Sequence, residues 1–187
     1  MRKLLVRVKN HFVMIVSIFS AFLSACGISS HKHLYGNKLL KLSDSKLFET
    51  VYFQMLDLVE SFPDEDIALS EMSAAQKTVY ILSIFDMEIQ NGGLCQFFVN
   101  PSRSLAPDVG EYLEIVGAEE HRQLFEEFAS ENQLDLTDLT SFEITDVEEF
   151  ATQTERYPFD DFDNAYCELQ SLQDYIVAYI RDNIEEF

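Results

Sequence analysis

The sequence predicts an all-α protein, with a single compact multi-helix domain after a signal peptide and a short tether. Apolar residues recur at helical spacing over most of the chain after residue 43, and glycine and proline separate these stretches. No alternating apolar and polar pattern competes with them as a strand. Hydrophobic residues make up 47% of the chain and include 16 Phe and 8 Tyr, so we expect a folded core and not a disordered chain.

The first 26 residues combine a basic start, a short apolar run and small residues before a cysteine. The basic residues are Arg2, Lys3, Arg7 and Lys9, the apolar run covers residues 12–23, and the stretch ends in Leu23-Ser24-Ala25-Cys26. A helix of that run would span roughly 18 Å, short of the ~30 Å hydrocarbon core, which favours a secretory signal over a transmembrane helix. The last four residues resemble a bacterial lipobox, which implies removal of residues 1–25 and acylation of Cys26. An uncleaved helix with an incidental cysteine stays open.

The lipoprotein resemblance implies a place in the bacterial cell envelope. The residue after Cys26 is Gly27 and not Asp. By resemblance to lipoproteins, this is compatible with a place in the outer membrane, facing the periplasm; the inner membrane stays open. Two or more acyl chains would hold the protein to the membrane, because one chain alone binds only marginally. Residues 26–43 then form a tether whose Lys32, Lys38 and Lys41 suit a position near anionic headgroups.

The expected helices of the domain, residues 44–187, are separated by prolines, glycines and capping residues. In order, they are a helix from Ser43 or Asp44 to Ser61, ended by Pro63; a helix from Ser70 or Ser73 to Gln90; a short amphipathic piece over 94–99; a helix from Pro107 to Gly117; a helix over 118–131; and, after irregular residues 132–144, a last helix over 162–184. The second helix is apolar on a broad face and is therefore expected at the centre of the fold.

Polar side chains are concentrated where the second helix stops, in a stretch flanked by strongly apolar residues. The pattern is E-x-x-N-G-G-x-x-Q-F-F-x-N, and its members are Glu88, Asn91, Gly92, Gly93, Gln96, Phe97, Phe98 and Asn100. Glycine can supply the left-handed residue that a helix end needs. We expect the amides and the carboxylate to satisfy backbone groups left unpaired at this break, so that Asn91→Ala lowers stability. A polar recognition pocket is the alternative.

This pattern resembles the signature of a small all-helical bacterial family, largely of unknown function, typified by a DNA-mimic protein. Ala106-Pro107, residues 115–120 and residues 162–166 also fit, so the resemblance covers about residues 71–181. The resemblance implies an all-α fold and a negative surface that occupies the basic groove of a DNA-binding protein. Such targets lie in the cytoplasm, so an exported member would need a different basic target. Cys95 falls on a variable position of the signature and receives no role from it.

The charge balance points to a basic partner. Without residues 1–25 the chain carries 9 Lys and Arg against 33 Asp and Glu, a net charge of −24. This sign excludes direct nucleic-acid binding and favours basic proteins. The candidate partner surface comprises Glu119, Glu120, Glu126, Glu127, Asp160, Asp161 and Asp163. Ordinary solvation of these carboxylates is the alternative.

The sequence carries no catalytic constellation, so we do not expect an enzyme, and it implies neither a metal nor an organic cofactor. The run 160–164 lacks the glycine and the twelfth-position glutamate of a calcium loop and is expected to cap the last helix. A disulfide between Cys95 and Cys167 stays open, as does a homodimer. The expected function is that of a lipid-anchored acidic binding protein, similar to an immunity or inhibitor protein. The alternatives are a cytoplasmic DNA mimic and an envelope structural lipoprotein.

Overall fold

The computed structural model describes residues 34–187, which form one compact unit. The regular elements in this range are all helical, so the predicted all-α class is confirmed. They are η1 (Gly36–Lys41), α2 (Asp44–Glu60), α3 (Glu65–Glu71), α4 (Ala74–Val99), η2 (Pro101–Leu105), α5 (Ala106–Ile115), α6 (Glu119–Glu131), η3 (Thr140–Phe142), α7 (Val147–Thr154), α8 (Phe159–Glu168), α9 (Leu172–Asp182) and η4 (Ile184–Glu186). The signal peptide and Cys26 lie outside the described residues.

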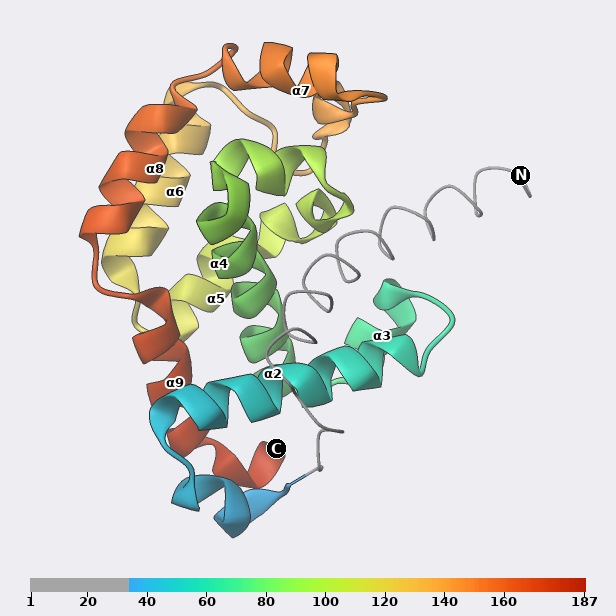
Figure 1. Cartoon of the computed structure of the whole chain (residues 1–187), viewed down its shortest axis with the longest axis vertical. Coiled ribbons are helices and arrows are strands. Elements are labelled where there is room, and N and C mark those ends of the chain that lie inside the picture. Colours follow the sequence, from blue (N-terminus) through green and yellow to red (C-terminus); the bar gives the residue numbers. More distant parts are fainter. Residues whose placement is uncertain (1–33) are drawn as a thin grey trace. The chain divides into compact units, whose positions relative to one another are not determined.

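Helix α4 lies at the centre of the domain, as its broad apolar face predicted. It contacts α2, α5, α8, α9 and η2, which surround it in Figure 1. Consecutive residues from Thr78 to Ser83 are buried on every side of the helix. The ring of Phe85 lies 5.2 Å from that of Phe97 and 5.3 Å from that of Phe125, in edge-on contacts. The core is therefore largely an aromatic cluster built around α4.

The start and the break of α4 follow the predicted signals. Ser73 accepts a hydrogen bond from Gln76 N (3.2 Å), and Gln76 Oε1 accepts one from Ser73 N (3.1 Å), which completes a capping box. At Gly92 and Gly93 the backbone leaves helical geometry, with φ values of −160° and +78°. The predicted stop at these glycines is confirmed, and residues 94–99 form a second helical piece of α4 beyond the kink.

Residues 34–43, expected to belong to the tether, are packed on the domain instead. Leu39 is fully buried, and Gly36 N donates a hydrogen bond to Phe187 O at 3.0 Å. The guanidinium of Arg181 bonds the carboxylate of Asp44 and also Leu42 O (3.1 Å). Burial of Leu39 explains why this segment packs on the domain. The glycine and lysines around Leu39 are typical of a loop, so the sequence did not predict the short amphipathic helix that they form.

Two short helices were not predicted, and aspartates at their starts explain both. Asp64 accepts a hydrogen bond from Ile67 N (2.9 Å) and begins α3 directly after Pro63, where the sequence predicts only the end of a helix. Asp146 accepts one from Glu149 N (2.9 Å) and begins α7. An acidic residue favours a helix start as readily as it marks a loop. Residues 132–144 are irregular, as expected, except for η3.

The prediction of one continuous last helix is wrong, because residues 159–182 form two helices, α8 and α9. Between them, Leu169 has an extended backbone with a ψ of 163°, and Ser171 also leaves helical geometry, with a ψ of 126°. Apolar periodicity continues across this break, so no pattern in the sequence reveals it. Asp160 and Asp161 lie in the first turn of α8, but no side chain among the described residues caps that helix, so the expected capping by this acidic run is wrong. Within the described range, no helix is long and apolar enough to span a bilayer.

Candidate functional site: a buried polar cluster and an acidic face

Glu88 is the centre of the buried polar cluster at the α4 kink. Its side chain comes from the middle of α4, and the residue is 6% exposed. Its Oε2 accepts hydrogen bonds from Gln96 Nε2 (2.7 Å) and Asn100 Nδ2 (2.8 Å), and its Oε1 accepts one from Ser102 Oγ (2.9 Å). Three donors thus satisfy the carboxylate where a buried charge would otherwise be costly.

The kink brings these donors to Glu88. In a straight helix, Gln96 would lie roughly 12 Å and Asn100 roughly 18 Å along the axis from Glu88. The side chains of Glu88 and Asn100 could not meet over that distance. The change of direction at Gly92 and Gly93 turns the second helical piece of α4 back toward the first. The motif residues therefore have two structural roles. The glycines allow the change of direction, and the polar residues stabilise it with hydrogen bonds across the kink.

Asp163 closes the kink from another helix. Its Oδ1 accepts a hydrogen bond from Leu94 N (2.9 Å), an amide of the first turn after the break. Burial raises the pKa of Asp163, and the bond from Leu94 opposes that rise. A Cβ placed at Gly93 would overlap the carboxylate of Asp163. Asp163, predicted as part of the partner surface, is thus half-buried and acts as a cap supplied by α8.

The remaining motif residues separate into core and surface. Phe97 and Phe98 are fully buried, and Phe98 lies 5.0 Å from the ring of Phe142. Asn91 is exposed, and its side chain makes no hydrogen bond with any residue in the range 34–187. The expectation that Asn91 satisfies the helix break is therefore wrong. Asp163 satisfies a backbone amide of the break, that of Leu94. The side chains of Gln96, Asn100 and Ser102 bond the carboxylate of Glu88 and not the backbone groups that the sequence led us to expect.

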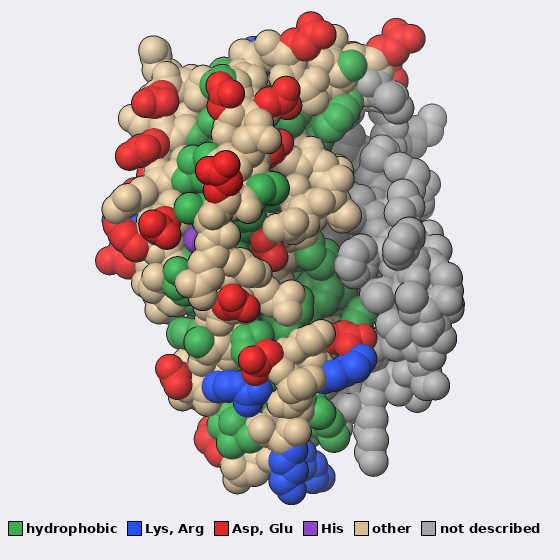
Figure 2. Space-filling model, turned by 60° about the vertical axis from the view of Figure 1, so that its left-hand side comes forward, with side chains coloured by type: hydrophobic (Ala, Val, Ile, Leu, Met, Phe, Trp, Pro, Cys, Tyr) green, Lys and Arg blue, Asp and Glu red, His purple; other side chains and the backbone are tan. Residues whose placement is uncertain are grey.

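The acidic face consists of the exposed carboxylates on α6 and α8. Glu119, Glu120, Glu126 and Glu127 on α6 and Asp160 and Asp161 on α8 are all exposed. Figure 2 shows Asp and Glu side chains spread over the upper and left parts of this side of the molecule. Residues 119–168 contain 16 acidic and two basic residues, whereas the other described residues contain 17 acidic and six basic. The acidic surplus per residue is therefore greatest in the segment from α6 to α8.

Arg122 divides the carboxylates of α6 into two rows. It bonds Glu119 (2.7 Å) and Glu126 (2.9 Å), one turn away on each side. Hydrogen bonds from Arg122 and Gln123 lower the pKa of Glu119 to about 2. Glu120 and Glu127 are seven residues apart and so share the other exposed row, beside the flank where Phe128 packs against Phe162 of α8. The described residues place no cation on this second row.

A buried histidine lies beneath this face, and no sequence pattern predicts it. His121 on α6 is 2% exposed, and neither ring nitrogen has a hydrogen-bond partner among the described residues. The rings of Tyr166 and Tyr175 meet it edge-on at 5.1 and 5.8 Å. Burial lowers the pKa of His121, although Glu120 opposes the shift. Tyr166 also donates a hydrogen bond to the buried Asp86 on α4 (2.8 Å).

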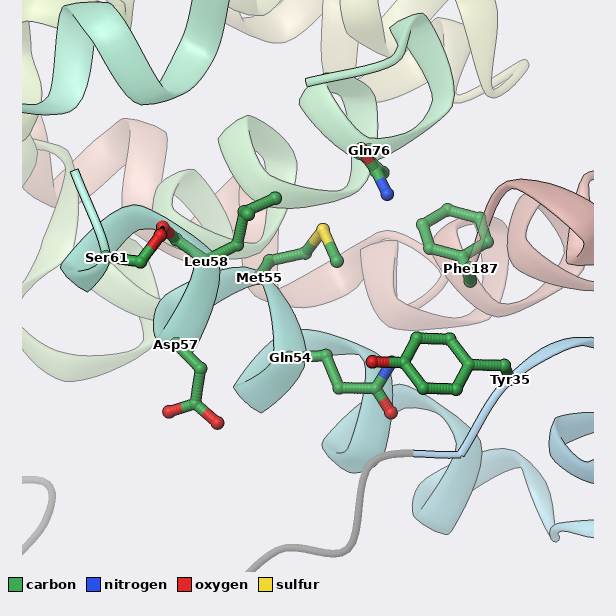
Figure 3. A pocket seen from close by; sticks show the side chains of 8 residues that line it. All are labelled: Tyr35, Gln54, Met55, Asp57, Leu58, Ser61, Gln76 and Phe187. Atoms are coloured by element: carbon green, nitrogen blue, oxygen red, sulfur yellow. Dashed lines mark hydrogen bonds between the residues drawn. The ribbon is translucent and has the colours of Figure 1, made fainter. Parts of the chain in front are cut away.

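A pocket of about 360 Å³ opens at the other end of the domain, between α2, the start of α4 and the C-terminus (Figure 3). Met55, Leu58 and Phe187 give it an apolar wall. Its glutamines hold the ends of the described chain, since Gln54 Oε1 accepts a hydrogen bond from Leu34 N (3.1 Å) and Gln76 Nε2 donates one to Glu186 O (2.9 Å). The pocket therefore belongs to the packing of the two ends.

Both cysteines of the domain are free thiols. Cys95 is buried on α4 and Cys167 is exposed on α8. Burial raises the pKa of Cys95 to about 12, which keeps the thiol protonated and unreactive at neutral pH. Between residues 34 and 187, no group of three His, Cys, Asp or Glu side chains is placed to hold a metal ion.

A comparison with models of protein families identifies the family of this chain. The family model described as DMP19-like protein matches residues 70–183. The chain belongs to the DMP19-like family. The matched range contains the α4 kink, its donors, Asp163 and the acidic face, and it agrees with the resemblance inferred from the sequence. Comparisons with curated proteins and with solved structures find no match.

Proposed function

We propose that this DMP19-like protein is a lipid-anchored acidic binding protein, in which the α6–α8 face engages a basic protein partner. The observation that carries this proposal is the concentration on α6 and α8 of exposed carboxylates that form no ion pair within residues 34–187. Glu120 and Glu127 share one row, and Asp160 and Asp161 lie on the first turn of the adjacent helix. Carboxylates held close together repel one another, and a basic surface relieves that repulsion.

The mode of action that follows is steric occupation of a cationic groove. The carboxylates are mounted on packed helices, so they are presented without a large cost for ordering them on binding. Opposite charges steer the two proteins together, and salt above ~0.1 M screens this attraction. An immunity or inhibitor role in the cell envelope, against a cationic toxin or nuclease domain, is the concrete form of the proposal.

The envelope location rests on the lipobox resemblance at Cys26. We would express the chain with Cys26 intact and as Cys26→Ala, fractionate the cells and determine the mass of the mature N-terminus. A diacylglyceryl-cysteine product in the membrane fraction supports the proposal. A full-length soluble product with both forms rejects the anchor and moves the alternative, a cytoplasmic DNA mimic that sequesters a DNA-binding protein, to first place. The family membership favours that alternative.

The partner surface is tested by charge reversal with a matched control. The test variant changes Glu120, Glu127, Asp160 and Asp161 to Lys, and the control changes Glu60, Asp66, Glu71 and Glu111, exposed residues on α2, α3 and α5, to Lys. Both variants change the net charge equally. A photo-crosslinker at Gln123 on α6 captures the partner, whose Kd is then measured at 50 and 500 mM salt.

We expect a basic partner, a Kd at least tenfold weaker in high salt, and a loss of at least 100-fold in affinity in the test variant alone. Equal losses in both variants would mean that only net charge matters. A partner that binds equally well at both salt concentrations would refute the electrostatic account.

A further inference from the structure

We infer that η1 and the residue before it form a second contact surface, which lies on an anionic phospholipid bilayer and directs the α6–α8 face away from it. This inference rests on the proposed lipid anchor, because the anchor brings the surface to the bilayer. It adds an orientation, which anchoring alone does not provide.

The geometry of η1 sorts its side chains into rows. A 3₁₀ helix has three residues per turn, so side chains three positions apart eclipse one another. Leu39 is fully buried, and Leu42, three residues later, also packs against the core. Lys38 and Lys41 therefore share an outward row, and Leu40 lies on the row beside it. Both lysines and Leu40 are exposed.

The apolar exposure of the domain is also concentrated here. The large hydrophobic side chains that are exposed within residues 34–187 are Tyr35 (63%), Leu40 (41%), Ile67 and Ile115. Two of these lie within six residues of chain, beside the two lysines. Tyrosine suits a membrane–water interface because its ring is apolar and its hydroxyl is polar. Lysines next to such residues attract anionic headgroups.

The surface is fixed to the domain and is not a loose arm. Gly36 N bonds Phe187 O, and Arg181 bonds both Asp44 and Leu42 O. These contacts join η1 to the C-terminal end of the chain. A bilayer that holds η1 therefore holds the whole domain in one orientation.

The charges favour orientation more than affinity. Asp182, Glu185 and Glu186 lie at the same end, and Asp44 is paired with Arg181, so the lysines alone would bind an anionic surface weakly. Residues 119–168, in contrast, have a formal net charge of −14, which an anionic leaflet repels. Figure 2 shows Lys and Arg side chains gathered toward the lower end of the molecule, and Figure 1 places α7 at the opposite end from η1.

The short link to the anchor supplies the proximity. Seven residues, 27–33, separate Cys26 from the described domain. A link of this length reaches at most about 28 Å. The domain is thus confined near the headgroups, where a weak charge asymmetry suffices to select one orientation.

A single-tryptophan reporter tests the orientation, because the chain contains no Trp. The full chain is reconstituted into nanodiscs of brominated phosphatidylcholine, with and without 30% phosphatidylglycerol, as Tyr35→Trp or, as the distant control, Ala151→Trp on the exposed surface of α7. We expect quenching of the Tyr35→Trp reporter to be at least twofold stronger in discs with phosphatidylglycerol than in discs without it. Adding Lys38→Glu and Lys41→Glu should remove the difference.

Equal quenching of the two reporters, or quenching at position 35 that ignores the lysine changes, would overturn the inference. The mass of the Cys26 peptide reports acylation separately. An acylated chain with equal quenching removes the orientation and leaves the anchor, whereas selective quenching of an unacylated chain supports the surface and removes the anchor. Thermal unfolding of each variant verifies that the domain is folded.

Discussion

The carboxylates at the α4 kink and those on the α6–α8 face are the same chemical group in opposite surroundings. Glu88 is buried and accepts three hydrogen bonds from side chains of its own domain. Glu120 and Glu127 are exposed, and the described residues give them no cation. The first carboxylate is already fully used by the fold, whereas the others can be satisfied only by water or by a partner.

This difference separates what the family pattern specifies from what binding requires. The motif residues build the kink, and the kink determines how η2 and α5 follow α4. The acidic residues contribute little to that arrangement, except for Asp163, which belongs to the kink. We therefore expect changes at the kink to affect stability and changes on the face to affect partner affinity.

The largest expected effect is that of Gly93→Ala. Its φ of +78° with a ψ of 177° is a region that essentially only glycine adopts, and it costs a side chain about 1–3 kcal/mol. The added Cβ would also displace the Asp163 carboxylate from Leu94 N, a charge-assisted bond of about 1.5–3 kcal/mol. We expect urea unfolding to show a loss of about 4 kcal/mol.

Gly117→Ala is the matched control for that substitution. Gly117 has a φ of +76°, but nothing lies within 4 Å of the position of its Cβ. The control should therefore lose only the backbone contribution, about 1–2 kcal/mol. Equal losses for the two alanine variants would show that the contact between Gly93 and Asp163 does not matter.

Glu88→Ala should lower stability by about 3 kcal/mol, because it leaves the half-buried side chains of Gln96, Asn100 and Ser102 without their acceptor. Glu88→Gln keeps an acceptor oxygen and should lose about 1 kcal/mol. Glu120→Ala, on the exposed face, should leave the free energy of unfolding unchanged. The comparison fails if Glu88→Ala is as stable as Glu120→Ala, or if it abolishes partner binding while the domain stays folded.

Much of this architecture followed from local patterns in the sequence. Ser73 was one of two predicted starts of α4, and the paired glycines predicted its break, because capping and backbone freedom depend on neighbouring residues alone. The all-α class followed from helical periodicity. The break between α8 and α9 did not, since the apolar stripe of the two helices continues on either side of residues 169–171 while the backbone leaves helical geometry there.

The site required contacts between residues far apart in the sequence. The motif suggested that Asn91 would satisfy the helix break, yet the donor that needed a partner, Leu94 N, is bonded by Asp163, 69 residues later. The assignment of Asp163 to the surface failed for the same reason. His121 was overlooked because a histidine between Glu120 and Arg122 looks like part of a solvated face, and only the packing of α8 and α9 buries it.

The buried His121, beneath the acidic face, should make the stability of the domain depend on pH. Burial lowers the pKa of its imidazole below the ordinary ~6.5, so the unfolded chain binds the proton more readily than the folded one. Stability from this group is therefore complete above about pH 6.5 and is lost as the pH falls. Burial raises the pKa of Asp86, so the folded chain binds this proton more readily and gains stability as the pH falls. This contribution is the same in the parent and in His121→Phe, so a comparison of the two isolates His121. Between pH 7.5 and 5.5, urea unfolding should show that the parent loses about 1 kcal/mol more than His121→Phe. Parallel pH profiles would refute a buried neutral His121.

The smallest expected effect is that of Asn91→Ala, and it tests the boundary between the kink and the solvent. Although Asn91 lies within the motif, directly before the two glycines, its side chain is exposed and unbonded within the described residues. Alanine also favours the helical backbone that precedes Gly92. The free energy of unfolding should change by less than about 0.5 kcal/mol. If the variant is fully stable and binds its partner more weakly, Asn91 belongs to the recognition surface. If the variant instead loses more than 1 kcal/mol, the side chain takes part in the break, and the division drawn between buried and exposed members of the motif is wrong at this residue.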